Sequence, residues 1–221
     1  MKIDWQAIDT LLLDMDGTLL DLHFDNYFWL HYLPQAYSEA FSLHPDEAKT
    51  YIYQLSDNKK STLDWYCLDH WSDELQMDIA ALKHDVQAKI ALRPFVEEFL
   101  QAQKRLGKQI LLVTNAHRAS LDLKMLITRL EHYFDAMIST HDYGVPKEHM
   151  TLWESLHADY HFNPARTLLI DDSEAILDCA ADYGIAHLLT ITQPDSQSPP
   201  RQGLKYPAFL HFDEIMPHDR S

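Results

Sequence analysis

The chain alternates short apolar runs with stretches of helical spacing, and this alternation limits the folds open to it more than any other feature. The runs cover residues 11–13, 109–115, 136–140, 167–172 and 186–191. Runs as short and as sharply bounded as these predict strands that are buried on both faces. Helical patterns between such strands are typical of a parallel sheet covered by helices. The sequence therefore predicts an α/β fold with a mainly parallel, five-stranded sheet.

One long segment, residues 22–91, departs from the alternation. Its apolar residues recur at helical spacing, as from Leu63 through Trp71 to Ile79, and no run within it resembles a strand. Roughly seventy residues is near the lower limit of domain size. We therefore predict a helical domain over 22–91, inserted into a core that is built from residues 1–21 and 92–221.

Composition restricts the classes of partner. The 221 residues include 18 basic and 34 acidic side chains, which gives a net charge of −16. Such a charge repels polyanions, so no nucleic acid polymer is expected as a partner. No apolar stretch is long enough to cross a bilayer, and the N-terminal residues do not resemble a secretory signal, so we expect no membrane contact and a cytoplasmic location. The two cysteines, Cys67 and Cys179, lie in apolar helical patterns and are expected to be buried thiols.

Polar side chains stand at the ends of four of the predicted strands or shortly after them. They are Asp14 and Asp16, Thr114 and Asn115, Lys147, and Asp171 and Asp172. Because the carboxyl ends of parallel strands share one edge of the sheet, these groups should converge there. Carboxylates brought together in this way repel one another unless a cation lies between them. Oxygen ligands at an open site suit Mg²⁺, which is the cofactor the sequence predicts.

Each of these residues also has a simpler interpretation. Asp14 and Asp16 precede Gly17 and could belong to an ordinary turn. The pair at 171–172 could cap the following helix, a role that Ser173 could also take. Taken alone, Thr114 could be a plain strand-end residue and Lys147 a solvated surface lysine.

The complete strings are more specific than their parts. The strings DMDGTLLD from Asp14, LLVTN ending at Asn115, PKE around Lys147 and LLIDDS ending at Ser173 resemble the motifs of the haloacid dehalogenase-like (HAD) superfamily. The resemblance implies a Rossmann-like core with an inserted helical cap of the C1 type, and it implies Mg²⁺-dependent hydrolysis of phosphate esters.

The resemblance also implies a role for each motif residue. Asp14 would be the nucleophile that forms an aspartyl-phosphate, and Asp16 the general acid and then the general base. Phosphate would be bound by Thr114, Asn115 and Lys147. Mg²⁺ would be held by Asp14, Asp16 and Asp172, with Asp171 as an outer-sphere or alternate ligand. Dehalogenases of the superfamily lack an acid at the position of Asp16, so its presence favours phosphate chemistry.

The start of the inserted segment and its middle are dense in aromatic and amide side chains, which could stack on and read a purine base. The candidates for substrate contact are Phe24, Asp25, Asn26, Tyr27 and Trp65. The alternative is that most of these aromatics form the core of the cap.

The strings LLLDMDGTLLDLHFDNYFW and LDWYCLDHW, together with PKE and LLIDDSEAILDCA, resemble bacterial 5′-nucleotidases of the superfamily that act on GMP and IMP. The resemblance implies a small phosphomonoester substrate, a purine nucleoside 5′-monophosphate. Two alternatives stay open. One is a phosphatase or phosphomutase for another small metabolite, such as phosphoglycolate or a sugar phosphate, and the other is a catalytically silent binding module with the same fold.

Overall fold

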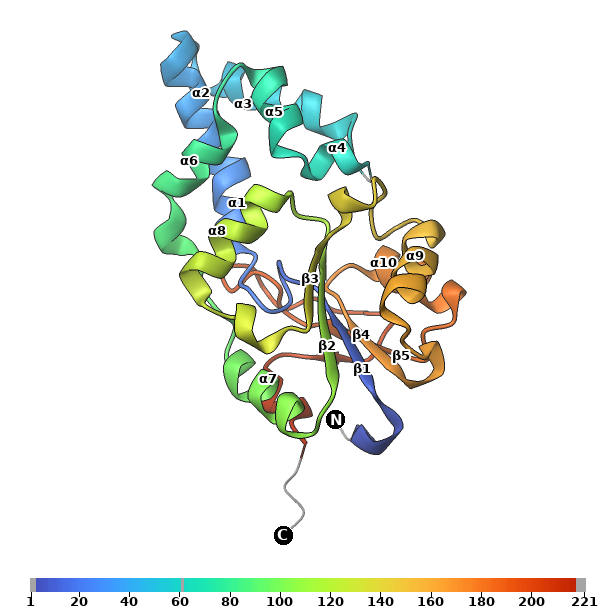
Figure 1. Cartoon of the computed structure of the whole chain (residues 1–221). Helices are drawn as coiled ribbons and strands as arrows, with labels where there is room; N and C mark the ends of the chain where they lie inside the picture. Colours follow the sequence, from blue (N-terminus) through green and yellow to red (C-terminus); the bar gives the residue numbers. More distant parts are fainter. Residues whose placement is uncertain (1–2, 61, 218–221) are drawn as a thin grey trace.

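The computed structural model describes residues 3–60 and 62–217, and its centre is one parallel sheet (Figure 1). The strand order is β3-β2-β1-β4-β5-β6, and every neighbouring pair is parallel. The strands are β1 (Thr10–Leu13), β2 (Gln109–Thr114), β3 (Ala136–Ser139), β4 (Thr167–Ile170), β5 (His187–Ile191) and β6 (Ala208–Phe209). The predicted α/β class and parallel sheet are confirmed.

The predicted number of five strands is wrong, because the chain adds a short sixth strand at one edge. After β5, residues 192–207 loop back, and the N–H of Thr190 donates to the carbonyl of Pro207 at 2.9 Å. The N–H of Thr192 likewise donates to the carbonyl of Phe209 at 2.9 Å. A strand of two residues is too short to produce an alternating pattern, so sequence periodicity could not reveal it.

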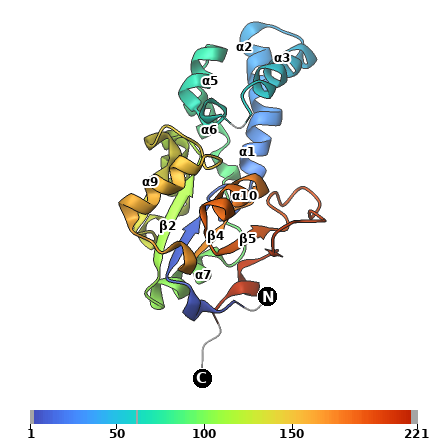
Figure 2. The same ribbon diagram turned by 90° about the vertical axis from the view of Figure 1, so that its right-hand side faces the viewer.

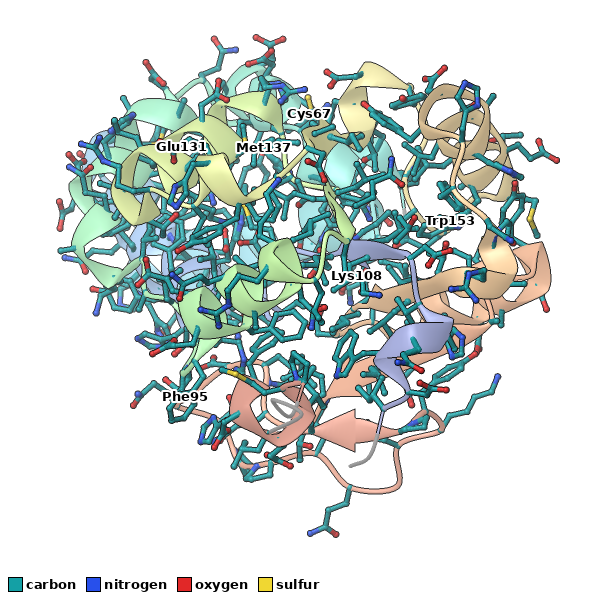
Figure 3. All side chains as sticks on the ribbon, turned by 60° about the horizontal axis from the view of Figure 1, so that its bottom comes forward. Cys67, Phe95, Lys108, Glu131, Met137 and Trp153 are labelled. Carbon is teal, nitrogen blue, oxygen red and sulfur yellow. The ribbon has the colours of Figure 1, made fainter. Side chains whose placement is uncertain are left out.

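Helices cover both faces of the sheet, and the strand β1 shows how the two cores divide. Leu12 belongs to the core under α9 (Met150–Tyr160) and α10 (Glu174–Tyr183). Its neighbours Leu11 and Leu13 belong to the core on the opposite face, under α7 (Val96–Arg105) and α8 (Arg118–Thr128). Figure 3 shows Trp153 of α9 on the first of these faces, where it is fully buried. The strand is therefore apolar on both sides, as the continuous run of leucines predicts.

Residues 22–60 and 62–91, which lie between β1 and β2, form helices joined by short turns and contain no strand. Figure 2 shows these helices stacked above the core, at the end of the molecule far from α7. The helices are α1 (His23–Tyr27), α2 (Leu33–Phe41), α3 (Pro45–Asp57), α4 (Leu63–Tyr66), α5 (Leu68–Leu75) and α6 (Ile79–Asp85), with a π-helical turn η2 (Phe28–Tyr32) between α1 and α2. We call these helices the cap; the proposed boundaries of the cap at 22 and 91 remain a prediction.

Six 3₁₀ turns complete the described part of the fold. They are η1 (Trp5–Ala7), η3 (Gln87–Lys89), η4 (Glu131–Tyr133), η5 (Thr140–Asp142), η6 (Pro164–Arg166) and η7 (Phe212–Ile215). Within the described ranges, no helix has both the length and the apolar character that a membrane span needs. The prediction of buried thiols is wrong, since Cys67 and Cys179 are both partly exposed. Cys67 lies at the amino end of α5, where the cap meets the core, rather than inside a helical stripe.

Candidate active site

Asp14 follows the last residue of β1 and lies beside Lys147 at the bottom of a cavity. Its Oδ1 lies 2.6 Å from the Lys147 Nζ, whereas its Oδ2 is buried and has no hydrogen-bond partner among the described residues. Burial, opposed by the charge of Lys147, raises the pKa of Asp14 to about 6. A carboxylate with one oxygen held and the other free is arranged to react or to bind a cation.

Asp171 and Asp172 follow β4, the strand that pairs with β1, and lie against Asp14. The Lys147 Nζ also donates to the Asp171 Oδ2 at 2.7 Å, so one lysine bridges two buried carboxylates. Carboxylate oxygens of Asp14, Asp171 and Asp172 all lie within 4.8 Å of one another. We call these three acids and Lys147 the acidic cluster.

Gly17 lets the two acidic motifs approach. Its φ of +83° is unfavourable for other residues, and a Cβ there would lie 2.8 Å from the Asp172 Oδ2. Any side chain at position 17 would collide with the Asp172 carboxylate, so the first motif needs a glycine there. Burial and the neighbouring Asp14 and Asp171 raise the pKa of Asp172 well above its usual value.

The acidic cluster fits a divalent metal ion. Its three carboxylates and single ammonium leave an excess of two negative charges, and the free Oδ2 of Asp14 is a ready oxygen ligand. Asp171 is already held by Lys147 and by the N–H of Ser173, 2.9 Å from its Oδ1. Asp14 and Asp172 therefore have the more available oxygens. The Ser173 side chain does not cap α10 with a hydrogen bond. The acidic pair contributes one hydrogen bond at this helix start, from the Ser173 N–H to Asp171.

Asp16 lines the same cavity but pairs with a lysine outside the acidic cluster. Its Oδ1 accepts a hydrogen bond from the Nζ of Lys124 in α8 at 2.6 Å, and the same ammonium donates to Asp25 of α1 at 2.6 Å. Asp25 in turn accepts from Lys83 of α6 at 2.7 Å. We call Asp16, Lys124, Asp25 and Lys83 the cap-side cluster. It joins the first motif of the core to two helices of the cap.

The electrostatics of the cap-side cluster follow from burial and pairing. Burial, opposed by Lys124, raises the pKa of Asp16 to about 6. Burial would also raise the pKa of Asp25, but Lys124 and Lys83 outweigh it and lower that pKa. Of the predicted metal ligands, the structure therefore gathers Asp14 and Asp172, while the Asp16 carboxylate is engaged by a lysine.

Thr114 is the last residue of β2, which pairs with β1, and Asn115 follows it; both line the cavity. The Thr114 hydroxyl accepts from the N–H of Ala116 at 3.0 Å, which leaves its proton free to donate to a ligand. The Asn115 side chain is committed within the protein: its Oδ1 accepts from the Lys147 N–H at 2.9 Å and its Nδ2 donates to Glu148 at 3.0 Å. Asn115 thus fixes the loop that carries Lys147.

Side chains of core and cap line a cavity of about 310 Å³ over these strand ends. Of the predicted substrate contacts, Asp25, Asn26 and Trp65 line it. Other aromatic side chains of the cap line it as well, namely Trp29, Tyr53, Tyr66 and Trp71. The cavity is large enough for a small organic ligand, and its lining combines these aromatic side chains of the cap with the acids of the core.

Two predicted contacts lie elsewhere. Phe24 is 1% exposed and packs under the cap-side cluster, with its ring centroid 4.9 Å from the Lys83 Nζ and 5.2 Å from the Lys124 Nζ. The ring of Tyr27 lies 4.0 Å from the Lys89 Nζ, away from the lining of the cavity. Phe24 therefore acts as cap core, as the simpler interpretation of the aromatics predicts.

Sequence reasoning missed Lys124 and Lys83. Lys124 is 1% exposed, and it shares the inward face of α8 with Leu121 and Met125. A lysine three residues after one buried apolar residue and next to another was the available signal. Lys83 of α6 is 2% exposed and lies four residues after the buried Ile79, so a similar signal was available for it.

The comparisons with known proteins agree with this geometry. A family model described as a haloacid dehalogenase-like hydrolase matches residues 8–184. The chain therefore belongs to the haloacid dehalogenase-like hydrolases, as the motifs predicted.

A relative with an assigned activity matches almost the whole chain. The protein described as GMP/IMP nucleotidase YrfG of Escherichia coli (strain K12) is 43% identical over 217 residues, which is 98% of each chain. Solved structures share the fold at low identity. A HAD phosphatase from Thermococcus onnurineus has a TM-score of 0.79 at 18% identity and covers 94% of this chain and 95% of its own. A putative beta-phosphoglucomutase from Thermotoga maritima has a TM-score of 0.68 at 16% identity and covers 95% and 97%.

Proposed function

We propose that the chain is a Mg²⁺-dependent phosphomonoesterase that hydrolyses the purine nucleoside 5′-monophosphates GMP and IMP to nucleoside and phosphate. The observation that carries the chemistry is the free Oδ2 of buried Asp14 at the bottom of a cavity shared by core and cap. The choice of substrate is supported by the relative named as a GMP/IMP nucleotidase, which matches cap and core alike.

In the first step a carboxylate oxygen of Asp14 attacks phosphorus, and the bond from phosphorus to the nucleoside 5′-oxygen breaks. Protonated Asp16 gives its proton to the departing oxygen, which leaves as the nucleoside hydroxyl. In the second step Asp16 removes a proton from water, which attacks the phosphorus of the aspartyl-phosphate and restores Asp14. Because the transition states are loose, positioning and charge neutralisation supply most of the catalysis.

Lys147 and Thr114 would contact the phosphate. Lys147 is fixed by two carboxylates, which raise its pKa even though burial opposes them, so it stays a cation at the site. The free proton of the Thr114 hydroxyl can donate to a phosphate oxygen. The Asn115 amide is already hydrogen-bonded to Lys147 and Glu148, so Asn115 would act by positioning Lys147 and not by binding phosphate itself.

Asp14 and Asp172 would hold Mg²⁺, with Asp171 beside them as an outer-sphere group. When bound, the ion supplies charge neutralisation between the carboxylates and the phosphate. Asp16 completes the ligand set that we predict, although its carboxylate is paired with Lys124 here. The expected cytoplasmic location and the absence of a nucleic acid partner likewise remain predictions.

The test is a phosphate-release panel with GMP, IMP, AMP, UMP, phosphoglycolate and glucose phosphates, each with Mg²⁺ and with EDTA. We expect kcat/KM for GMP and IMP to exceed that of every other compound by at least about tenfold, which is 1.4 kcal/mol, and EDTA to abolish turnover. A preference for a sugar phosphate or phosphoglycolate would overturn the proposed substrate. Release from no compound, with Mg²⁺ bound, would indicate a silent binding module.

A further inference from the structure

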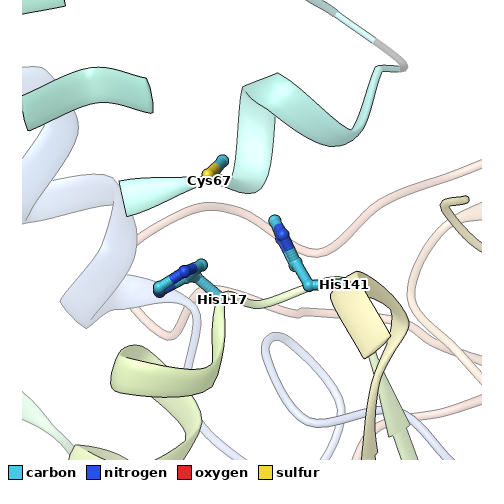
Figure 4. Close-up of side chains that lie close together, drawn as sticks. All are labelled: Cys67, His117 and His141. Atoms are coloured by element: carbon cyan, nitrogen blue, oxygen red, sulfur yellow. The ribbon is translucent and has the colours of Figure 1, made fainter. Parts of the chain in front are cut away.

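A second group of metal-binding side chains lies where the cap meets the core. A ligand atom from each of Cys67, His117 and His141 lies within 4.8 Å of the other two. Figure 4 shows Cys67, from the cap, facing the two imidazoles. His117 precedes α8 and His141 lies in η5, so the three residues come from three separate segments of the chain. We propose that they form a binding site for a borderline-soft divalent transition ion, Zn²⁺ above all, which ties the cap to the core.

His141 is oriented as a metal-binding histidine would be. Its ring forms a hydrogen bond with the backbone of Asn115, while its Nε2 is buried and has no hydrogen-bond partner in residues 3–60 and 62–217. The bond to Asn115 therefore falls to Nδ1, which leaves the lone pair of Nε2 unused. Histidines that bind metals commonly donate one ring N–H to a carbonyl and coordinate through the other nitrogen.

His117 lies beside this unused nitrogen, with its ring centroid 5.1 Å from that of His141 and nearly perpendicular to it. The His117 Nδ1 accepts a long hydrogen bond of 3.4 Å from the Ala119 N–H, and its Nε2 lies 3.5 Å from the Asp69 Oδ2. Coordination through Nε2 moves the ring proton to Nδ1 and gives up two long contacts, the one with the Ala119 N–H and the one with Asp69. The exposed Asp69 is within reach as a fourth ligand.

Cys67 supplies the ligand that selects the metal. Its sulfur accepts a hydrogen bond from the His70 N–H at 3.5 Å, and this contact can persist when the sulfur is a metal-bound thiolate. One proton leaves for solvent as the thiol ionises. A thiolate with two imidazoles suits Zn²⁺, Cu²⁺ or Ni²⁺ but not Mg²⁺, which prefers oxygen. The site is therefore chemically distinct from the acidic cluster.

A bound ion would act on the cap. Cys67 and Asp69 belong to the cap, whereas His117 and His141 belong to the core, so coordination crosses the boundary between them. His117 also lines the shared cavity. Binding to this folded arrangement alone stabilises the protein and holds the cap against the core.

The test measures Zn²⁺ binding in excess Mg²⁺ by competition with a chromophoric chelator, and does not depend on the proposed phosphatase activity. Wild type should bind one Zn²⁺ per chain, and Cys67→Ala and His141→Gln should each weaken binding more than about 100-fold, since even outer-shell changes cost 10- to 100-fold. The matched control is Cys179→Ala, the other partly exposed cysteine, which should bind as wild type does. Asp172→Asn should also retain the ion.

Two further readouts separate ligation from general damage. Co²⁺ should give a thiolate charge-transfer band in wild type and in Cys179→Ala but not in Cys67→Ala. Zn²⁺ should raise the Tm of wild type and leave that of both ligand variants unchanged. Retention of wild-type Zn²⁺ affinity in either Cys67→Ala or His141→Gln would overturn the proposal, as would loss of the ion in Asp172→Asn alone.

Discussion

The acidic cluster and the cap-side cluster are built from the same two residue types and are balanced in opposite ways. In the acidic cluster one lysine pairs with two of the three aspartates, and the Oδ2 of Asp14 has no hydrogen-bond partner among the described residues. In the cap-side cluster Lys124 and Lys83 serve Asp16 and Asp25. The first cluster is therefore incomplete without an added cation, whereas the second is electrically complete.

The difference in charge balance indicates that the two clusters have different functions. Uncompensated buried charge costs stability, and proteins retain it where it prepares a site for a ligand. A balanced, hydrogen-bonded set fixes the parts that it joins, here the first motif and the helices α1 and α6. We infer that one cluster reacts while the other positions Asp16 and the cap beside it.

The largest expected effect is the loss of activity when the free carboxylate is removed. Asp14→Asn should lower kcat for GMP by at least about 10³-fold, because removing a nucleophile abolishes the covalent route. The measurement is phosphate release by purified protein with an unchanged circular dichroism spectrum. Asp9→Asn is the control, an exposed acid just before β1 at the opposite end of that strand, and should keep wild-type kcat. Wild-type turnover by Asp14→Asn would refute the proposed mechanism.

The second effect tests whether the cap-side cluster is structural. Lys124→Met leaves Asp16 and Asp25 without their shared cation and should lower the free energy of unfolding by about 3 kcal/mol. Urea denaturation measures the change. The matched control is Lys104→Met, which breaks a partly exposed pair with Asp135 and should cost less than about 1 kcal/mol. Equal losses in the two variants would mean that the cluster does not hold the cap in place.

The two clusters also differ in how far the sequence predicts them. The acids of the acidic cluster stand at strand ends, and the rule that parallel strands end on one edge brings Asp14 and Asp172 together without knowledge of the fold's details. Asp16 and Lys124 are 108 residues apart, and the lysine lies in the middle of a helix. The residues around Lys124 in the sequence do not indicate which buried acid it pairs with.

The cap illustrates the same limit. Helical spacing correctly predicts helices there, but it gives only which residues share a face, not which face meets the cavity. Phe24 and Trp65 are both apolar residues at helical positions, yet Phe24 packs inside and Trp65 lines the cavity. That choice depends on how the cap lies over the core, which is a tertiary property.

A third prediction compares one acid from each cluster in protein freed of metal by EDTA. The pKa of Asp172 is raised by burial, so its stabilising contribution is present below the unfolded value of about 4 and is lost as the pH rises through the folded pKa. Near neutral pH, Asp172→Asn should therefore raise the Tm, by about 2 to 4 °C for each kcal/mol recovered. The difference from wild type should vanish below about pH 4.

Asp25→Asn should shift the Tm in the opposite direction. The pKa of Asp25 is lowered by Lys124 and Lys83 against the effect of burial, so its contribution is present above about pH 4 and is lost as the pH falls through the folded pKa. Its removal should lower the Tm at neutral pH. The measurement is the Tm of both variants and of wild type as a function of pH. Tm shifts of the same sign in the two variants would contradict the inference that one cluster lacks a cation and the other does not.

The smallest effect concerns the space between the clusters, where the base of the nucleotide would lie. Base stacking on an aromatic side chain is worth about 1 to 3 kcal/mol, so Trp65→Ala should raise KM for GMP at least about fivefold and change kcat little. The control is Tyr51→Ala, an exposed cap aromatic outside this cavity, which should leave KM unchanged. A fall in kcat without a rise in KM would show that Trp65 acts on the acids and not on the base, and would move the substrate contact to another aromatic of the cavity.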